Sequence, residues 1–194
     1  MTKPAIATQK TNGQSKPRAN LSKTLLLLAT VCVICAGQVS AQQSLGDLVA
    51  EGGFDWMIGR WTTTTDEGEK IQLIYRWQLD KHLVTMQLKT PEFEYHGMIF
   101  YVPAKDQVVQ VGVDNRGGSG KGLWEPDGDK AVMKVEHTDV DGGTQRMALA
   151  HSRVSNETMK LQMYTVESTG ELADEPWATL EFKRGKTKAR KTDE

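Results

Sequence analysis

The 194-residue chain has little cysteine, little proline and no long apolar run. Its two cysteines, Cys32 and Cys35, both lie in the longest apolar run, the twelve residues 25–36. A membrane-spanning helix needs about 20 apolar residues, so we expect no membrane span. Six prolines and 18 glycines exclude a collagen-like repeat, and 38% apolar with 25% charged residues is typical of a soluble globular protein with many turns.

The first 41 residues predict a secretory signal peptide. Five basic residues and no acidic one precede the apolar run, and the small-residue site Val39-Ser40-Ala41 follows it. A lipoprotein signal would need a small residue before its cysteine, but Val31 and Ile34 stand there. We therefore expect cleavage after Ala41 and an exported protein, secreted or periplasmic. The mature chain then has no thiol, which excludes disulfides, thiolate metal sites and a cysteine nucleophile.

Charge is unevenly distributed along the predicted mature chain. Residues 42–182 hold 13 basic and 23 acidic residues, a net charge of −10, whereas residues 183–194 hold six basic and two acidic ones. An acidic body repels phosphate backbones, so nucleic-acid binding is disfavoured. We expect residues 185–194 to form a basic, disordered tail.

Hydrophobic residues recur with a period of two over most of the body. Ile71, Leu73, Tyr75, Trp77 and Leu79 alternate with mostly polar residues, which is typical of a strand with one buried face. The same alternation appears in Val84/Met86/Leu88, Val109/Val111/Val113, Ala131/Met133/Val135, Met147/Leu149 and Leu161/Met163. We expect these apolar sets to form the buried faces of their strands.

Turn signals between the alternating runs predict ten strands joined by hairpins. The predicted strands are 59–65, 70–79, 82–90, 94–102, 107–114, 119–125, 130–138, 144–154, 158–167 and 177–183. A short helix over 44–49, with Ser44 as its N-cap and Gly52-Gly53 after it, is expected to precede them.

Ten consecutive antiparallel strands predict an all-β domain over residues 42–184. Such strands can form a sandwich or a closed up-and-down barrel, and short hairpins favour the barrel because closure removes exposed strand edges. A ten-stranded barrel is wider than the eight-stranded kind that side chains can fill, so we expect a cavity.

The segment Phe54-Asp55-Trp56-Met57-Ile58-Gly59-Arg60-Trp61 resembles the opening of calycin-type barrels, in which Gly-x-Trp begins the first strand. With ten strands, the chain is similar to lipocalin-like families of secreted bacterial proteins of unknown function, and more distantly to nitrobindin-type haem barrels. The resemblance implies that Gly59 and Trp61 form a barrel floor. Closure of the barrel would bring Arg184 over the Trp61 indole.

The resemblance favours a ligand cavity over a haem site. Nitrobindin-type barrels bind iron through a histidine near the C-terminus, and no histidine follows His151 here. The leading hypothesis is a non-catalytic barrel that binds a small apolar molecule, without a cofactor. Its candidate ligand-binding residues are Tyr75, Trp77, Met86, Met133, Met147, Leu149, His151 and Met163, with Asp114 and Arg116 as a polar group at one barrel end.

Three alternatives remain open on the residues alone. The first is a haem barrel with His151 as axial ligand, the second an enzyme that uses interior histidines and the Asp114/Arg116 end, and the third a solid-cored interaction module. No two histidines have zinc-ligand spacing. The glycine-rich stretch 114–122 lacks the spacing of a phosphate-binding loop, and 127–129 and 139–143 lack a full calcium ligand set, so we interpret all three as hairpin turns.

Overall fold

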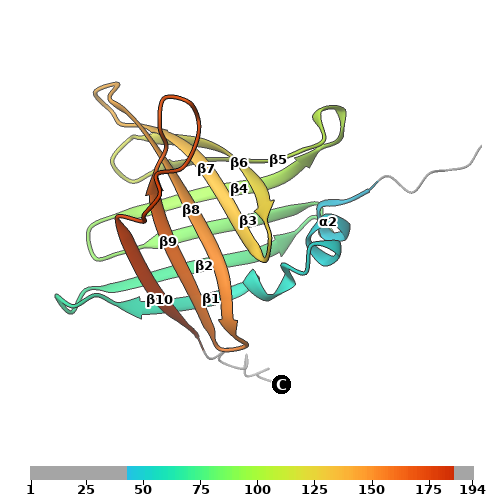
Figure 1. Ribbon diagram of the computed structural model, residues 1–194, viewed down its shortest axis with the longest axis horizontal. Coiled ribbons are helices and arrows are strands. Elements are labelled where there is room, and N and C mark those ends of the chain that lie inside the picture. The colour runs from blue at the N-terminus through green and yellow to red at the C-terminus, as the bar shows by residue number, and fades with distance from the viewer. Residues whose placement is uncertain (1–42, 186–194) are drawn as a thin grey trace, which may run out of the picture. The chain divides into compact units, whose positions relative to one another are not determined.

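The computed structural model describes residues 43–185, which form a closed barrel of ten antiparallel strands (Figure 1). Each strand pairs with its neighbours in sequence, and the first strand pairs with the last. The predicted fold class is therefore confirmed. The predicted signal peptide, its cleavage site and residues 186–194 of the predicted tail lie outside the described residues.

The predicted strands are all present, each within two residues of its expected bounds. They are β1 (Gly59–Thr64), β2 (Lys70–Gln78), β3 (Leu83–Lys89), β4 (Glu94–Val102), β5 (Gln107–Asp114), β6 (Ser119–Asp127), β7 (Lys130–Thr138), β8 (Thr144–Ser155), β9 (Thr158–Thr165) and β10 (Ala178–Arg184). Short 3-10 turns, η1 (Asp55–Met57) and η2 (Pro103–Lys105), precede β1 and join β4 to β5.

The helix α2 (Leu45–Glu51) lies at one end of the barrel (Figure 1). Ser44 caps it as predicted, because its hydroxyl accepts a hydrogen bond from the Asp47 N–H while the Asp47 carboxylate accepts one from the Ser44 N–H. Gly52 ends the helix, and Leu45 is buried in the barrel core. Among residues 43–185, no helix has the length and apolar character needed to cross a bilayer.

The first and last strands meet at a seam that joins several backbone segments. Trp61 pairs with Arg184, whose guanidinium lies 4.2 Å from the centre of the indole ring. The same guanidinium donates hydrogen bonds to the carbonyls of Ile58 (3.0 Å) and Trp56 (2.6 Å). Gly59 has a φ of +137°, and a Cβ there would lie 2.8 Å from the Arg184 guanidinium, so a side chain at Gly59 would displace it.

The interior contains the expected apolar faces of β2, β3, β7, β8 and β9, except that Leu79 lies in the turn after β2 and is 71% exposed. The expectation for β5 is wrong. Gln110 faces inward and is 1% exposed, whereas Val113 faces outward and is 60% exposed. Val109 and Val111 share the outer face with Val113. An interior hydrogen bond favours this orientation of β5, because the inward-facing Gln110 side chain accepts it from Trp124 Nε1 at 3.0 Å.

A glycine on the inner face of β5 reinforces the same orientation. The ring of Tyr95 lies against Gly112, where a Cβ would come within 2.4 Å of the phenol oxygen. Gly97 and Gly120 flank Gly112 on the neighbouring strands, in register with it. A valine turned inward at position 112 would therefore displace Tyr95 from the core.

The long connection between β9 and β10 covers part of the outer surface. Leu172 in this connection packs with Val132, Ala148 and Ala150 on the outer faces of β7 and β8. A bridge between Val166 and Leu172 holds the connection against the barrel. The chain itself thereby covers the part of the outer surface formed by Val132, Ala148 and Ala150.

Candidate functional site

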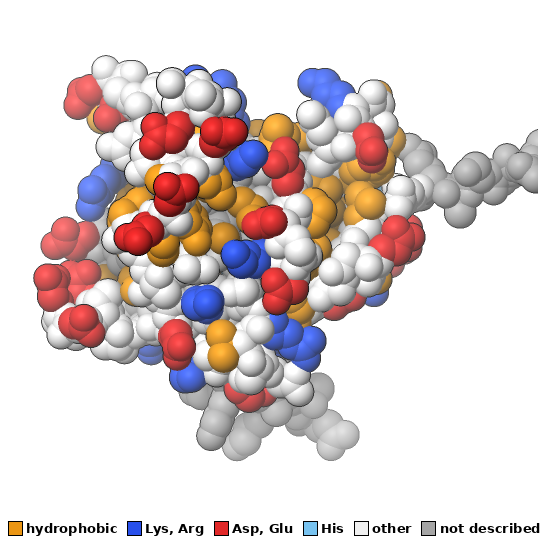
Figure 2. Space-filling view, in the orientation of Figure 1, with side chains coloured by type: hydrophobic (Ala, Val, Ile, Leu, Met, Phe, Trp, Pro, Cys, Tyr) orange, Lys and Arg blue, Asp and Glu red, His pale blue; other side chains and the backbone are white. Residues whose placement is uncertain are grey.

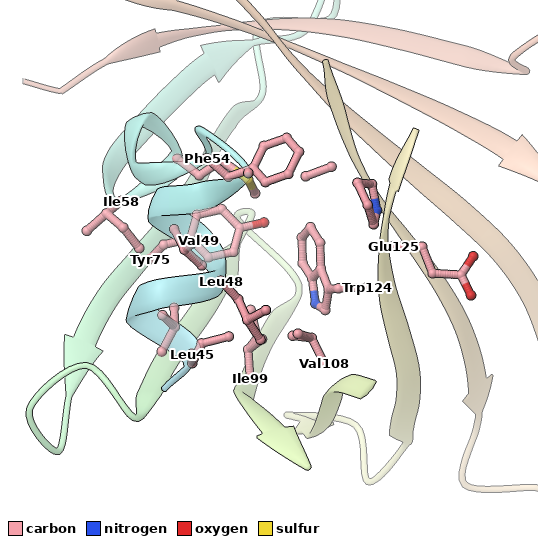
Figure 3. Close-up of a pocket in the computed structure, with 15 residues that line it drawn as sticks. Leu45, Leu48, Val49, Phe54, Ile58, Tyr75, Ile99, Val108, Trp124 and Glu125 are labelled. Carbon is pink, nitrogen blue, oxygen red and sulfur yellow. The ribbon is translucent and has the colours of Figure 1, made fainter. Parts of the chain in front are cut away.

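A cavity of about 220 Å³ lies at the barrel end that carries α2. Figure 3 shows the helix on one side of this cavity, Trp124 and Val108 on the other, and Tyr75 between them. Its lining is almost entirely apolar, with Glu125 as the one charged side chain among the described residues that line it. In Figure 2, apolar side chains gather near α2 on the face in view, with acidic side chains around them.

Segments far apart in the sequence form the walls of this cavity. The helix contributes Leu45, Leu48 and Val49, while the barrel contributes residues from the six consecutive strands β2 to β7. The barrel residues are Tyr75, Val84, Ile99, Val108, Trp124 and Ala131, and the link between helix and barrel adds Phe54, Met57 and Ile58. Two backbone hydrogen bonds position the helix, from the Gly46 N–H to the Lys81 carbonyl and from the Phe54 N–H to the Val49 carbonyl.

A buried tyrosine–histidine pair lies beside the cavity. The Tyr75 hydroxyl is 3.0 Å from Nε2 of His151, and Nδ1 of His151 is 3.3 Å from the Ala131 carbonyl oxygen. A carbonyl can only accept, so Nδ1 carries the proton and Nε2 accepts the hydrogen bond from Tyr75. Trp124 packs on the same imidazole, with ring centres 5.1 Å apart.

Burial sets the charge of both members of this pair. Desolvation lowers the pKa of His151 to about 4 and raises the pKa of Tyr75, so both side chains are neutral at neutral pH. Each satisfies the other's hydrogen-bonding capacity in an apolar surrounding. The pair therefore gives the cavity a neutral polar edge and places no fixed charge there.

The His151 environment does not fit haem ligation. An axial ligand must offer Nε2 or Nδ1 to the iron, but Tyr75 and the Ala131 carbonyl already take these two nitrogens. The imidazole is also 1% exposed, which leaves no open face beside it for a macrocycle. Within residues 43–185 there is likewise no group of three or more histidine, cysteine, aspartate or glutamate side chains placed to hold a metal ion.

The predicted ligand-binding residues do not converge on one pocket. Of the candidates, Tyr75 lines the cavity and His151 contacts it through Tyr75 and Trp124. Met86 and Met133 are fully buried in the barrel. The remaining apolar candidates, Trp77, Met147, Leu149 and Met163, are half-buried on inner faces outside this cavity.

The predicted polar group lies at the opposite barrel end. Asp114 is six residues along β5 from Val108, a separation of about 20 Å in an extended strand. Its carboxylate accepts hydrogen bonds from His137 Nε2 (2.7 Å) and from the backbone N–H groups of Arg116 and Gly118. Burial raises the pKa of Asp114, but these hydrogen bonds outweigh that effect and lower it.

These contacts make Asp114 a turn-forming residue with most of its acceptor capacity already used. Arg116 extends away and packs over the ring of Phe93, 5.7 Å from its centre. The two side chains are therefore not arranged to hold a ligand head group together. The hydrogen bond between Asp114 and His137 was not anticipated from the sequence, because the two residues belong to different hairpins.

No protein-family model matches the chain, and no curated protein matches it either.

Proposed function

We propose that this chain is an exported, non-catalytic barrel that binds a small apolar molecule in the cavity beneath α2. One observation carries the proposal: a cavity of about 220 Å³ with almost no polar side chain on its walls persists at the end of a barrel whose seam is tightly joined. Apolar cavities in proteins stay dry, and they bind apolar molecules of matching size.

The volume limits the class of ligand. A cavity of roughly 150 Å³ holds one benzene molecule, so this one suits a ligand the size of a substituted or fused aromatic ring. It is smaller than the roughly 300 Å³ at which drug-sized sites begin. The aromatic faces of Tyr75, Trp124 and Phe54 favour a flat molecule, since stacked or edge-on ring contacts stabilise such a complex.

Export and the calycin-like relationship belong to the same proposal. The basic segment, apolar run and small-residue site at residues 1–41 support export. The Gly59/Trp61/Arg184 arrangement supports a lipocalin-like barrel, because it lies where such barrels join their first and last strands. Cleavage after Ala41 removes both cysteines, and a mature chain without a thiol suits an oxidising compartment.

A titration with uncharged probes tests the binding proposal. Indole and naphthalene are added to the protein while the fluorescence of the tryptophans and the melting temperature are followed. Saturable binding at one site, with a higher melting temperature, supports the proposal, since a ligand that binds only the native state stabilises it.

Matched variants locate the site. Val108→Phe places a ring into the cavity and should abolish binding of both probes, whereas Val154→Phe changes an outward-facing residue that is 55% exposed and should leave binding unchanged. The proposal is refuted if no probe binds the wild-type protein, or if binding persists unchanged in Val108→Phe while that variant keeps its native circular dichroism.

A further inference from the structure

An apolar face lies on the outside of the barrel, apart from the cavity. Six outward-facing residues on β4, β5 and β6 form it: Met98, Phe100, Val109, Val111, Val113 and Leu123. They are in contact by register, since Met98 pairs with Val111 and Phe100 with Val109, which in turn pairs with Leu123. Met98 is 48% exposed and Val113 is 60% exposed. We call these six residues the outer apolar face.

Basic side chains border this face, although the chain as a whole is acidic. Two hollows of about 670 and 530 Å³ flank Val111 and share it as a lining residue. The residues that line them include five basic ones, Arg76, Lys105, Lys121, Lys134 and Arg146, and one carboxylate, Glu136. Glu136 pairs with Lys121 and Arg146, and Lys134 pairs with Glu125, so these two carboxylates offset only part of the positive charge of the border. Residues 43–185 contain 15 basic and 23 acidic residues in all, so the border concentrates positive charge. An apolar floor with a cationic border fits an acidic, partly apolar segment.

The chain carries such a segment beside the same face. The connection over residues 166–177, which we call the acidic loop, holds Glu167, Glu171, Asp174 and Glu175 and no basic residue. Among the ion pairs of residues 43–185, none includes a carboxylate of this loop. The loop ends at Trp177, which is 60% exposed.

The position of the loop favours a symmetric arrangement. Val166, its first residue, lines one of the two hollows, so the acidic loop begins at the edge of the basic border. A two-fold axis near that edge would place the acidic loop of each copy on the basic border of the other, with both contacts formed at once. Most soluble homo-oligomers close in this way, with the same patch used on both subunits.

We propose that the chain forms a two-fold homodimer in which the acidic loop of each copy packs against the outer apolar face and basic border of the other. The interface lies away from α2, so it does not depend on ligand binding in the cavity. Apolar residues on three strands, of which Met98, Val111 and Val113 are exposed, give the interface its apolar centre, and the charges set its register.

Sedimentation velocity on the full chain, at low and high salt and over a wide concentration range, tests the dimer. One variant, Lys105→Glu/Lys121→Glu, reverses the charge at two positions of the border; it leaves the Arg146–Glu136 ion pair in place and breaks the Lys121–Glu136 pair. A second, Glu167→Lys/Glu171→Lys, reverses the charge at two of the four acidic positions of the loop. The control Lys70→Glu/Arg153→Glu makes the same charge change as the first variant at positions on β2 and β8 that line neither hollow.

We expect the wild type and the control to dimerise, more weakly at high salt, and each reversed variant to raise the dissociation constant about tenfold or more. An equimolar mixture of the two reversed variants should regain a dimer with one copy of each, detected by mass. A wild-type protein that stays monomeric at every concentration overturns the proposal. This holds also if the monomer co-sediments with vesicles of anionic phospholipid, since the face would then bind a membrane surface and not a second copy. A dimer that neither variant weakens also overturns it.

Discussion

Replacement of Trp61 by alanine should destabilise the protein more than replacement of Trp124 or Trp177 by alanine. The Trp61 side chain is fully buried, with 0% exposure, and its Nε1 donates a hydrogen bond to the Met57 carbonyl at 2.8 Å. Arg184 covers one face of the indole, and Trp56 packs edge-on at 6.3 Å between ring centres. The change removes contacts to β10 and to η1 together.

The expected loss follows from these contacts. Removal of a buried tryptophan costs about 3–5 kcal/mol, and the lost attraction between Arg184 and the indole adds about 1 kcal/mol. A total of about 4–6 kcal/mol corresponds to a fall of about 10–20 °C in melting temperature for a domain of this length. Trp124 is half-buried and borders an existing cavity, so Trp124→Ala should cost about 3 kcal/mol. Trp177 is 60% exposed, and its replacement should change stability by less than about 0.5 kcal/mol.

Urea denaturation and thermal melts of the three alanine variants measure this order directly. Trp61→Phe, which keeps a ring beneath Arg184, provides a milder variant in case Trp61→Ala does not fold. Equal losses for Trp61→Ala and Trp177→Ala, or a larger loss for Trp124→Ala, would refute the argument that Trp61 and Arg184 hold the closing seam.

Three further predictions concern the His151 region. The pKa of His151 is about 4 in the native protein, below the ordinary value of about 6.5, so the unfolded chain binds a proton that the native chain does not as the pH falls between these values. The free energy of unfolding should therefore drop by about 2–3 kcal/mol between pH 7 and 4.5. Urea denaturation of His151→Gln should lack this part of the pH dependence. Tyr75→Phe leaves Nε2 of His151 buried without its donor and should cost about 1–3 kcal/mol in the same assay at pH 7; no loss would mean that the hydrogen bond contributes nothing. Hemin titration should give a broad absorbance, equal in wild type and His151→Ala; a sharp Soret band that disappears in His151→Ala would restore haem as the ligand.

The barrel could be predicted from the sequence because its strands alternate cleanly and its hairpins are short. The run from Ile71 to Trp77 has one apolar face, and the structure turns that face inward. The same pattern gave a wrong prediction for strand β5, because Val109, Val111 and Val113 form the more apolar of its two faces and yet face outward. Which set faces inward was decided by partners on other strands, Trp124 and Tyr95, and local periodicity contains no information about them.

The cavity was only partly predictable. Tyr75 and His151 were identified as candidate interior residues from the sequence, and both lie in the interior. The helix residues Leu45, Leu48 and Val49 were not assigned to a site, although their shared apolar face was visible in the sequence. Their role depends on where α2 docks, and that is set by contacts such as the hydrogen bond from Gly46 to Lys81 across 35 residues.

The most direct test of the central claim is native mass spectrometry of the mature protein isolated from its own source, beside the same protein with Val108→Phe. We expect a fraction of the wild-type protein to carry one additional small molecule, identified after solvent extraction as apolar and of aromatic-ring size, and we expect no such fraction in Val108→Phe. Wild-type protein that carries no molecule and binds no apolar probe in solution would contradict it, as would a bound molecule that Val108→Phe retains.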